Sequence, residues 1–359
     1  MGLLVTIAFF FAAPQWTIQT SGTIARLRGV SVVNARVAWA SGADSTVLRT
    51  TDGGTSWKKL TVTSDKLDFR DIDAFDERTA YILSIGNGPR SRIYKTTDGG
   101  ATWTLQFRND DPRAFYDSMS FWDRDHGIVI GDSIDGQFCV LMTENGGREW
   151  KRVPAGALPP ALENEGAFAA SGTNIAVFGK THAWIGTGAA RTARVLRTTD
   201  RGRTWTVADT PLNAGPAAGI FSIAFRDPKH GVIVGGDYTK ENEAVDNLAV
   251  TNDGGVTWRL VKGLSGYRSA VAYVPDSLAL VAVGPSGVDY STDDGRTWTK
   301  SEIRNPQSAI QNSQSEFPLG FDTLSFAPVK TRRATGGSGA VGWAAGANGN
   351  IARVILLPQ

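Results

Sequence analysis

Short apolar runs and polar turns alternate along the chain in an arrangement that returns several times. A run rich in β-forming residues, such as 27–32 or 221–225, is followed by a polar turn. An apolar run that ends in glycine, such as 37–42 or 231–236, comes next. Runs of this length and composition, bounded by turns, are typical of short β-strands. The pattern therefore predicts a chain built from repeated strand pairs.

A second motif, Thr/Ser-x-Asp-x-Gly-x-Thr/Ser-Trp, follows most of these pairs. Five copies end at Trp57, Trp103, Trp205, Trp258 and Trp298, and a degenerate sixth ends at Trp150. This is the Asp-box, or BNR repeat, of sialidase-like propellers, and we expect a structural role for it. The acidic side chain accepts backbone N–H bonds inside the turn, and the glycine adopts a left-handed conformation. The residues predicted in this structural role are Asp52, Asp98, Asn145, Asp200, Asp253 and Asp293.

The spacing of the box tryptophans gives the number of repeats. Their intervals lie between 40 residues (Trp258 to Trp298) and 55 residues (Trp150 to Trp205). Each unit then supplies four short strands, which is one propeller blade. A seventh strand pair follows Trp298 without a box, and Trp16 lies 41 residues before Trp57, in step with the repeat. We therefore predict an all-β, seven-bladed propeller, whose ring closes when the N-terminal strand pairs into the last blade.

The N-terminal residues suggest export. Residues 3–13 are almost wholly apolar and precede Pro14. This run is too short for a membrane span, which needs roughly 20 residues, but it suits the core of a secretory signal peptide. The alternative is a buried first strand. We predict a signal peptide over 1–14, a single propeller domain over 15–359, no membrane span in the mature chain, and a periplasmic or extracellular location.

Composition adds few constraints. The net charge of +2 gives no reason to expect a nucleic-acid partner, and the single cysteine, Cys139, cannot form an intrachain disulfide. No dinucleotide-binding turn or metal-ligand cluster is present, so no cofactor and no metal are expected. His126, His182 and His230 occupy the same turn in three repeats and should point away from each other, as turn residues.

The whole mature chain resembles the photosystem II stability/assembly factors and their bacterial relatives. The resemblance rests on the boxes and on the repeated inner pattern, as in 27–30 followed by 50–54. It also resembles a bacterial group loosely labelled oxidoreductase or BNR-repeat glycosyl hydrolase, through residues 165–173 and 266–271. The resemblance implies a seven-bladed propeller that binds a membrane-protein precursor through an arginine-rich face. We expect the chain to be a monomer.

Candidate binding residues lie where the innermost strands of the blades should begin. Arg28, Arg70 and Arg268 occupy matching positions in three repeats, and Tyr116 occupies the same position in a fourth. Innermost strands line the channel of a propeller, so these side chains are predicted near one mouth of it. Guanidinium groups there suit a carboxylate, a phosphate or an acidic peptide. The alternative is that the arginines form salt bridges between blades.

A glycoside hydrolase is the alternative function. Sialidases bind the carboxylate of the substrate with three arginines and use a tyrosine nucleophile, and here the matching catalytic residues would be Tyr267, Glu165 and Asp71. The fit is poor, because sialidases have six blades and Arg28 is followed by Gly29–Val30 rather than by their Arg-Ile-Pro sequence. We predict a protein-binding or assembly factor without a catalytic group. The sequence does not name its partner.

Overall fold

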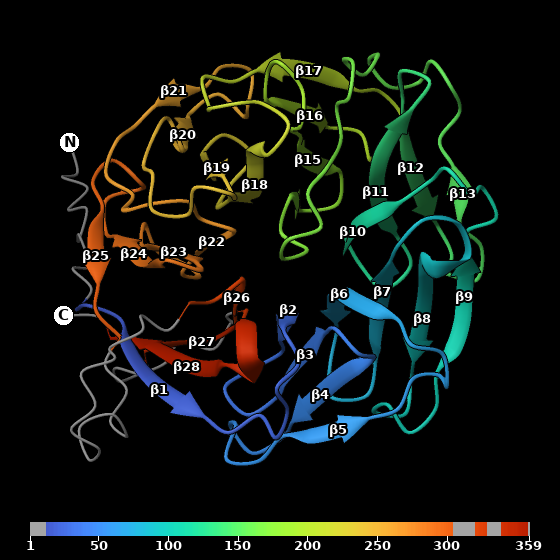
Figure 1. Cartoon of the computed structure of the whole chain (residues 1–359), viewed down its shortest axis with the longest axis vertical. Coiled ribbons are helices and arrows are strands. Elements are labelled where there is room, and N and C mark those ends of the chain that lie inside the picture. Colours follow the sequence, from blue (N-terminus) through green and yellow to red (C-terminus); the bar gives the residue numbers. More distant parts are fainter. Residues whose placement is uncertain (1–11, 304–319, 329–338, 358–359) are drawn as a thin grey trace, which may run out of the picture.

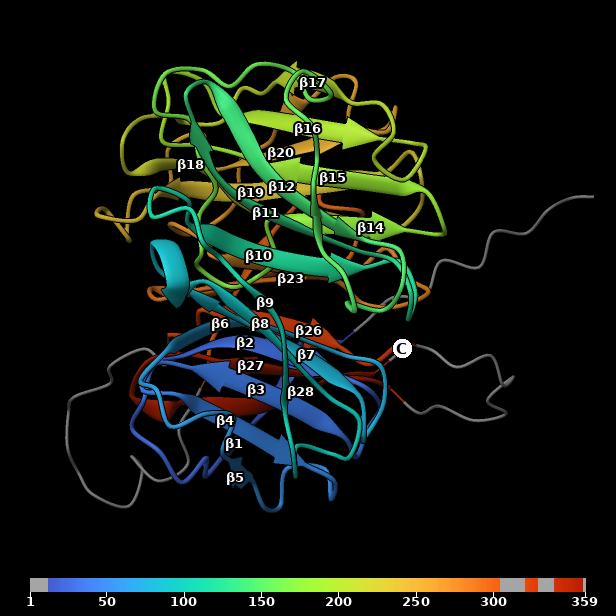
Figure 2. The ribbon, with the colours of Figure 1, turned by 90° about the vertical axis from the view of Figure 1, so that its right-hand side faces the viewer.

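The computed structural model describes residues 12–303, 320–328 and 339–357. In this part of the chain, twenty-eight strands form seven antiparallel sheets of four strands each, arranged as a ring of blades around a central axis (Figures 1 and 2). The predicted seven-bladed β-propeller is confirmed. We name the blades A to G in the order in which their inner strands occur in the chain.

The first four blades follow one plan, with their strands running in chain order from the channel outward. Blade A consists of β2 (Leu27–Val32), β3 (Ala38–Gly42), β4 (Thr46–Thr50) and β5 (Lys58–Leu60). Blade B consists of β6 (Asp68–Ala74), β7 (Ala80–Ile85), β8 (Arg92–Thr96) and β9 (Thr104–Arg108). Blade C consists of β10 (Tyr116–Phe121), β11 (Gly127–Ile134), β12 (Gln137–Thr143) and β13 (Lys151–Arg152). Blade D consists of β14 (Ile175–Phe178), β15 (His182–Gly186), β16 (Arg194–Thr198) and β17 (Thr206–Asp209).

The other three blades also have four strands each, again from the channel outward. Blade E consists of β18 (Ala218–Phe225), β19 (Gly231–Asp237), β20 (Leu248–Thr251) and β21 (Arg259–Leu260). Blade F consists of β22 (Ala270–Tyr273), β23 (Leu280–Gly284), β24 (Gly287–Ser291) and β25 (Thr299–Ser301). Blade G consists of β26 (Thr323–Phe326), β27 (Ala340–Ala345), β28 (Ile351–Leu356) and β1 (Gln15–Gln19). The short 3₁₀ helices η1 (Gly88–Arg90) and η3 (Ala347–Gly349) lie in connecting loops.

Blade G combines the two ends of the propeller. Strand β1 pairs antiparallel with β28, with Trp16 opposite Val354 and Ile18 opposite Ala352. The Trp16 ring also stacks on Phe321, with 5.6 Å between the ring centroids. The predicted closure by the N-terminal strand is thus confirmed, and it pairs an edge strand that would otherwise be open. Of the predicted signal peptide, residues 1–11 lie outside the described residues.

The two faces of the disc differ in what they carry. The inner strands all run through the disc in the same direction, and in Figure 2 they begin at the left. We call this side the start face; it faces the viewer in Figure 1. The opposite side carries the six box turns, and we call it the box face.

The six box turns share one hydrogen-bond pattern. In the first turn, Asp52 Oδ1 accepts the Ser56 amide at 3.0 Å and the Thr50 hydroxyl at 2.8 Å, and Gly53 and Gly54 have positive φ. These bonds to the carboxylate lower the pKa of Asp52 to about 2. The equivalent residues Asp98, Asn145, Asp200, Asp253 and Asp293 accept the corresponding bonds.

Polar side chains join the inner strands around the channel. At each of the seven junctions between blades, a polar side chain in an inner strand, or within two residues before it, bonds to the corresponding part of the next blade. The pairs are Ser31 with Ala74, Asp71 with Met119, Ser118 with Asn174, Thr173 with Ser222, Ser222 with Val271, Ser269 with Asp322, and Ser325 with Val32. Each buried bond contributes about 1 kcal/mol, and together they fix the relative position of the blades.

Candidate functional site

The mouth of the channel on the start face is crossed by residues 166–174, which we call the plug segment. This segment leads into β14 of blade D, which begins only at Ile175. Its backbone is tied at one end by a two-way bridge between Gly166 and Gly188. Most of its residues are buried, and Ser171 is only 2% exposed. In Figure 1 the light-green chain of blade D can be followed into the centre of the ring.

The plug segment contacts every other blade. Its hydrogen-bond partners are Arg28 in blade A, Arg70 in blade B, Asp117 and Asp132 in blade C, Ser222 in blade E, Ser269 beside blade F, and Thr323 in blade G. A segment held from all sides in this way closes the channel. A ligand on the start face therefore lies over the channel and does not enter it.

Small residues make this crossing possible. Gly172 has a φ of +73°, a left-handed conformation, and a Cβ there would lie 2.2 Å from Asp71 Oδ1. A buried ion pair between Glu165 and Arg194 anchors the N-terminal end of the segment. Glu165 also accepts the Thr187 hydroxyl at 2.6 Å and the Leu162 amide at 2.8 Å.

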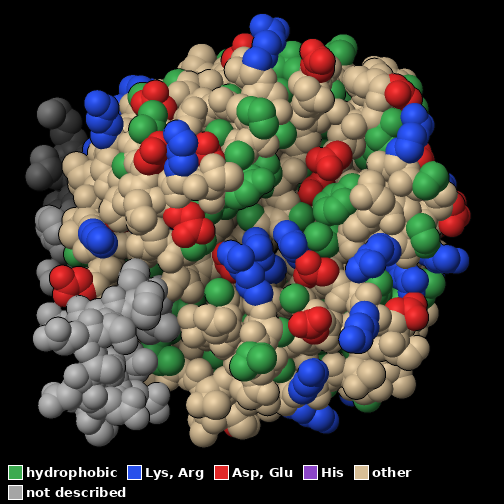
Figure 3. Space-filling model, in the orientation of Figure 1, with side chains coloured by type: hydrophobic (Ala, Val, Ile, Leu, Met, Phe, Trp, Pro, Cys, Tyr) green, Lys and Arg blue, Asp and Glu red, His purple; other side chains and the backbone are tan. Residues whose placement is uncertain are grey.

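Three arginines meet at the plugged mouth. Arg28 Nη1 donates to the Ala170 carbonyl at 3.2 Å, and Arg70 Nη1 donates to the Ala169 carbonyl at 2.9 Å. Arg26, just before β2, forms a two-point pair with Asp322 at 2.7 and 2.8 Å. Figure 3 shows Lys and Arg side chains gathered at the centre of this face, with hydrophobic side chains beside them.

The charge of Arg28 is only partly compensated. Its closest carboxylate, Asp322, is 3.8 Å away and is already engaged by Arg26. Burial lowers the pKa of Arg28, and repulsion from Arg70 and Arg26 adds to this, against the opposite effect of Asp322. Burial also raises the pKa of Asp71 and of Asp117 well above the usual range, because it disfavours their charged forms.

An aromatic cluster adjoins the plug. The Phe168 ring of the plug segment stacks on Phe221 with 4.0 Å between centroids, and Tyr238 packs edge-on against both rings. Tyr238 remains 48% exposed. The start face thus offers an apolar surface next to guanidinium groups.

The structure separates the four predicted binding residues into two pairs. The prediction that all four occupy matching positions is wrong, because Arg28 and Arg70 lie at the bulge of their inner strands, whereas Tyr116 and Arg268 align with the residue before it. Arg28 and Arg70 lie at the channel mouth, with 16% and 27% of their side chains exposed. Tyr116 is buried in the core between blades B and C, edge-on to Phe107. Arg268 is fully buried and pairs with Asp289 of its own blade at 2.6 Å, so this ion pair lies within a blade rather than between blades.

The three residues of the alternative catalytic site are engaged elsewhere. Tyr267 is buried edge-on to Phe221, and burial raises its pKa well above the usual value, which disfavours a phenolate nucleophile. Glu165 holds the plug segment, and Asp71 bonds to the Met119 amide at 2.6 Å. Within the described parts of the chain, no hydrogen bond joins any two of these three side chains.

The histidines lie on the box face, His126 and His230 in turns and His182 at the start of β15. His126 and His230 each contact the aspartate three residues earlier, Asp123 and Asp227, and His182 contacts Thr181. Residues 12–303, 320–328 and 339–357 contain no group of three His, Cys, Asp or Glu arranged to hold a metal ion. Over the same ranges no helix is long and apolar enough to cross a membrane.

Sequence reasoning missed two parts of this site. Arg26 lies one residue before the start of β2, outside the position that matches between repeats. The plug segment had a usable signal, because the 55-residue interval from Trp150 to Trp205 exceeds the other intervals, and residues 166–173 combine small side chains with two glycines.

Comparison with known proteins supports the fold. The model of the family described as "Sortilin, neurotensin receptor 3" matches residues 45–160, less than half of the chain, and so does not assign the chain to that family. No curated protein matches the sequence.

Solved structures share the architecture at low identity. YCF48 bound to a D1 peptide is 16% identical over 96% of this chain and 98% of its own, with a TM-score of 0.62. YCF48 from Cyanidioschyzon merolae is 17% identical over 95% and 98%, with a TM-score of 0.61. The GH74 xyloglucanase from Xanthomonas campestris is 16% identical over 94% of this chain but only 53% of its own, with a TM-score of 0.65. At these identities the likeness shows the fold alone, and one fold serves both a peptide-binding protein and a glycoside hydrolase.

Proposed function

We propose that this propeller is a protein-binding module that holds an acidic segment of a partner protein across its start face. The carboxylates of the partner would lie on Arg28 and Arg70. The observation that carries the proposal is the incompletely neutralised guanidinium group of Arg28, with Arg70 beside it, at a plugged channel mouth.

The hydrogen-bonding capacity of these arginines favours a carboxylate ligand. A guanidinium carries five N–H donors, and Arg28 gives one hydrogen bond, to Ala170, among the described residues. Arg70 pairs with Asp68 at 3.0 Å and bonds to Ala169. Two-point binding of a carboxylate to such a group is stronger and more directional than binding to an ammonium.

The surroundings favour a protein segment over a small ligand. The plug segment leaves a broad face rather than a deep hole, and the exposed ring of Tyr238 adds apolar contact area beside the arginines. The YCF48 propeller, which has the same fold, binds a D1 peptide. By analogy we propose that this chain assists the assembly of an envelope complex.

The experiment is capture of the partner from a native envelope extract by the tagged protein, read by mass spectrometry. We expect a defined partner with wild type and at least tenfold less of it with the double variant Arg28→Gln/Arg70→Gln. The matched control is Arg36→Gln/Arg78→Gln, which removes two exposed charges from the box face.

One further variant separates charge from plug position. Ser171→Ala removes the plug bond to the Ser269 carbonyl without changing any charge, and capture should persist. Equal loss of capture in the box-face control, or no defined partner with folded wild type, contradicts the proposal.

Export is part of the same proposal and rests on the apolar run 3–13. Residues 1–14 fused to a reporter that is active only outside the cytoplasm should give reporter activity. A fusion in which Leu3 and Leu4 are changed to Asp should give none. If the fusion with the unchanged residues 1–14 is inactive, the proposed role in the envelope is contradicted.

A further inference from the structure

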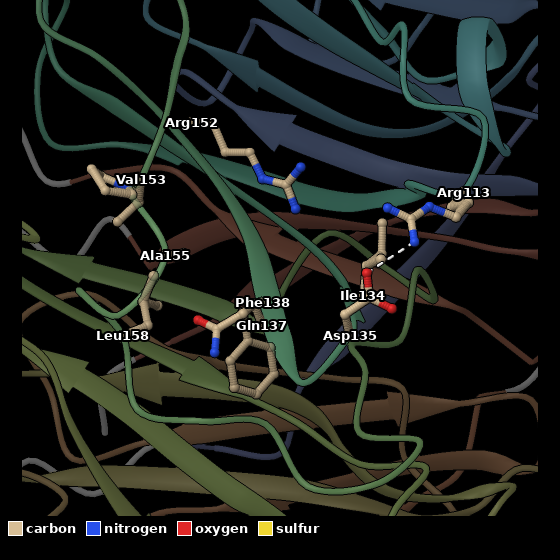
Figure 4. Close-up of a pocket in the computed structure, with 10 residues that line it drawn as sticks. Arg113, Ile134, Asp135, Gln137, Phe138, Arg152, Val153, Ala155 and Leu158 are labelled. Carbon is tan, nitrogen blue, oxygen red and sulfur yellow. Dashed lines mark hydrogen bonds and ion pairs between the residues drawn. The ribbon is translucent and has the colours of Figure 1, made fainter.

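A pocket of about 390 Å³ opens on the start face at the outer side of blade C (Figure 4). Its walls come from the hairpin between β11 and β12 and from the chain after β13, where the longest interval between boxes begins. Because these segments all lie on the start face, the pocket faces the same side as Arg28 and Arg70. The proposed function does not use it.

The floor of the pocket is apolar and rigid. Phe138 and Leu158 are only 3% and 6% exposed and belong to the core between blades C and D. The main chain also fixes the wall, since the Ala161 amide bonds to the Gly136 carbonyl at 2.9 Å. A compact apolar group can therefore bind here without rearranging the core.

Two guanidinium groups reach over this floor. Figure 4 shows Arg113 and Arg152 pointing toward one another from different segments. Arg113 pairs with Asp135 at 2.9 Å and lies 3.6 Å from Asp111. Arg152 has weaker partners: its Nη2 contacts the Cys139 sulfur at 3.1 Å, and Asp111, the carboxylate beside it, is 3.9 Å away.

Arg152 is therefore the guanidinium group that lacks a close carboxylate and to which an anion would bind. Burial raises the pKa of the Cys139 thiol, so near neutral pH the sulfur is a weak neutral acceptor. Asp111 lies beside both arginines, and Asp135 is committed to Arg113. An incoming carboxylate between the guanidinium groups would add charge-assisted hydrogen bonds and reduce their mutual repulsion.

We propose that this pocket binds a second element of the partner segment: a carboxylate carried next to a compact apolar side chain. The carboxylate would lie on Arg152 and the apolar side chain on Phe138 and Leu158. The volume is near the small end of the roughly 300–1,000 Å³ range of ligand pockets, which suits one or two residues of a peptide. The inference rests on the proposed function, because it takes the ligand to be part of a protein.

The test uses a short peptide rather than the unidentified partner. The probe is an acetylated and amidated tetrapeptide, glycine–phenylalanine–aspartate–glycine, titrated with the whole protein and observed by NMR of its aromatic protons. We expect binding that weakens at least tenfold with Arg152→Gln or when asparagine replaces the aspartate. Ala155→Phe, which fills the pocket and keeps both arginines, should also abolish binding.

The matched control is Lys151→Gln. It removes the same charge from the adjacent residue, whose side chain is 74% exposed, and should change the affinity less than twofold. Near-ultraviolet circular dichroism of each variant checks that the fold is intact. Equal binding of the aspartate and asparagine peptides, or unchanged binding with Arg152→Gln, would overturn the inference.

Two further arms separate the possible causes. If 3-phenylpropionate binds through Arg152 but the tetrapeptide does not, the pocket serves small carboxylates and the inference is wrong. Arg28→Gln/Arg70→Gln should leave tetrapeptide binding unchanged while it removes capture of the partner. If the protein binds the tetrapeptide but captures no partner, the result contradicts the proposed function and leaves the inference about the pocket intact.

Discussion

Blades A and F each carry an arginine where the inner strand begins, but at neighbouring positions of the repeat and with opposite roles. Val30 lies opposite Ala40 in blade A and Val271 lies opposite Ala282 in blade F, so Arg268 corresponds to Leu27 and Ser269 corresponds to Arg28. Arg28 of blade A remains at the channel mouth, whereas Arg268 of blade F is fully buried within its blade. The position of Arg268 points into the blade, and the third strand supplies its counter-charge. At the third-strand position where blade F has Asp289, blade A has Leu48.

Asp289 neutralises the charge of Arg268 inside blade F. The pair is joined at 2.6 and 2.7 Å, and Ser265, Ser286 and the Tyr267 carbonyl accept the remaining guanidinium bonds. In blade A the corresponding residues are Leu27 and Leu48, which lie in one buried apolar cluster. Arg28 follows Leu27 at the bulge of the inner strand and contacts the plug segment. A difference of one residue in register therefore decides whether an arginine lies at the channel mouth or inside a blade.

The largest expected effect comes from breaking the blade F pair. Asp289→Leu leaves Arg268 buried without its counter-charge and should lower the free energy of unfolding by about 3–5 kcal/mol. Urea unfolding followed by tryptophan fluorescence measures this. The double variant Arg268→Met/Asp289→Leu should recover most of the loss; if it is no more stable than the single variant, the unpaired charge is not the cause.

A smaller effect is expected when the plug segment is moved without changing any charge. Gly172→Ala adds a Cβ in a left-handed conformation against Asp71 and should cost about 2–3 kcal/mol. Urea unfolding gives the loss, and hydrogen exchange should show faster exchange in residues 166–174 than in wild type. Gly136→Ala, at a positive φ with no atom within 4 Å, is the control for backbone strain alone.

The pH dependence of stability should sharpen the contrast between the faces. Near the start face, burial raises the pKa of Asp132 to about 6, above the ordinary 3.8. Between these values the folded state binds more protons than the unfolded state, so the free energy of unfolding falls as pH rises from about 4 to above 6. Asp132→Asn should remove on the order of 1–2 kcal/mol of this dependence in urea unfolding at a series of pH values.

The box face should respond in the opposite sense. Hydrogen bonds lower the pKa of Asp52 to about 2, so the stability that Asp52 supplies is present above pH 4 and is lost as pH falls toward 2. Asp52→Asn should leave the curve between pH 4 and 6 unchanged. A change in that window would show that the two faces are coupled.

The smallest effect is expected for Arg28→Gln. This change removes one bond to the plug segment from a partly exposed side chain and should cost about 1 kcal/mol or less. Urea unfolding of Arg28→Gln and Arg268→Gln side by side gives the comparison directly. Similar losses for the two variants would mean that Arg28 is as structural as Arg268.

The fold could be predicted from the sequence because its signals are local and repeated. Each box turn makes its own hydrogen bonds within a few residues, and Trp16 is in step with the box tryptophans, which indicated the ring closure. The site depends on contacts between distant residues. Arg70 meets Ala169, and Arg28 meets Ala170, across the channel, and neither partner has a side chain that would signal the contact.

Two features near the site had signals in the sequence. Asp289 is a carboxylate in an otherwise apolar third strand, which indicates a buried cation nearby, and the long interval before Trp205 marked an insertion. The sequence did not indicate that the inserted segment crosses the channel instead of extending into solvent.

The pairing of β1 with β28 also sets the order in which the molecule can be completed. Blade G draws one strand from the beginning of the chain and three from its far end. At synthesis rates of roughly 5–20 residues per second, β1 has to wait on the order of tens of seconds for the strand that it pairs with. Until β28 emerges, β1 has no partner strand and the ring is open. The nascent chain therefore passes through an incomplete form with unpaired strand edges, to which a chaperone could bind.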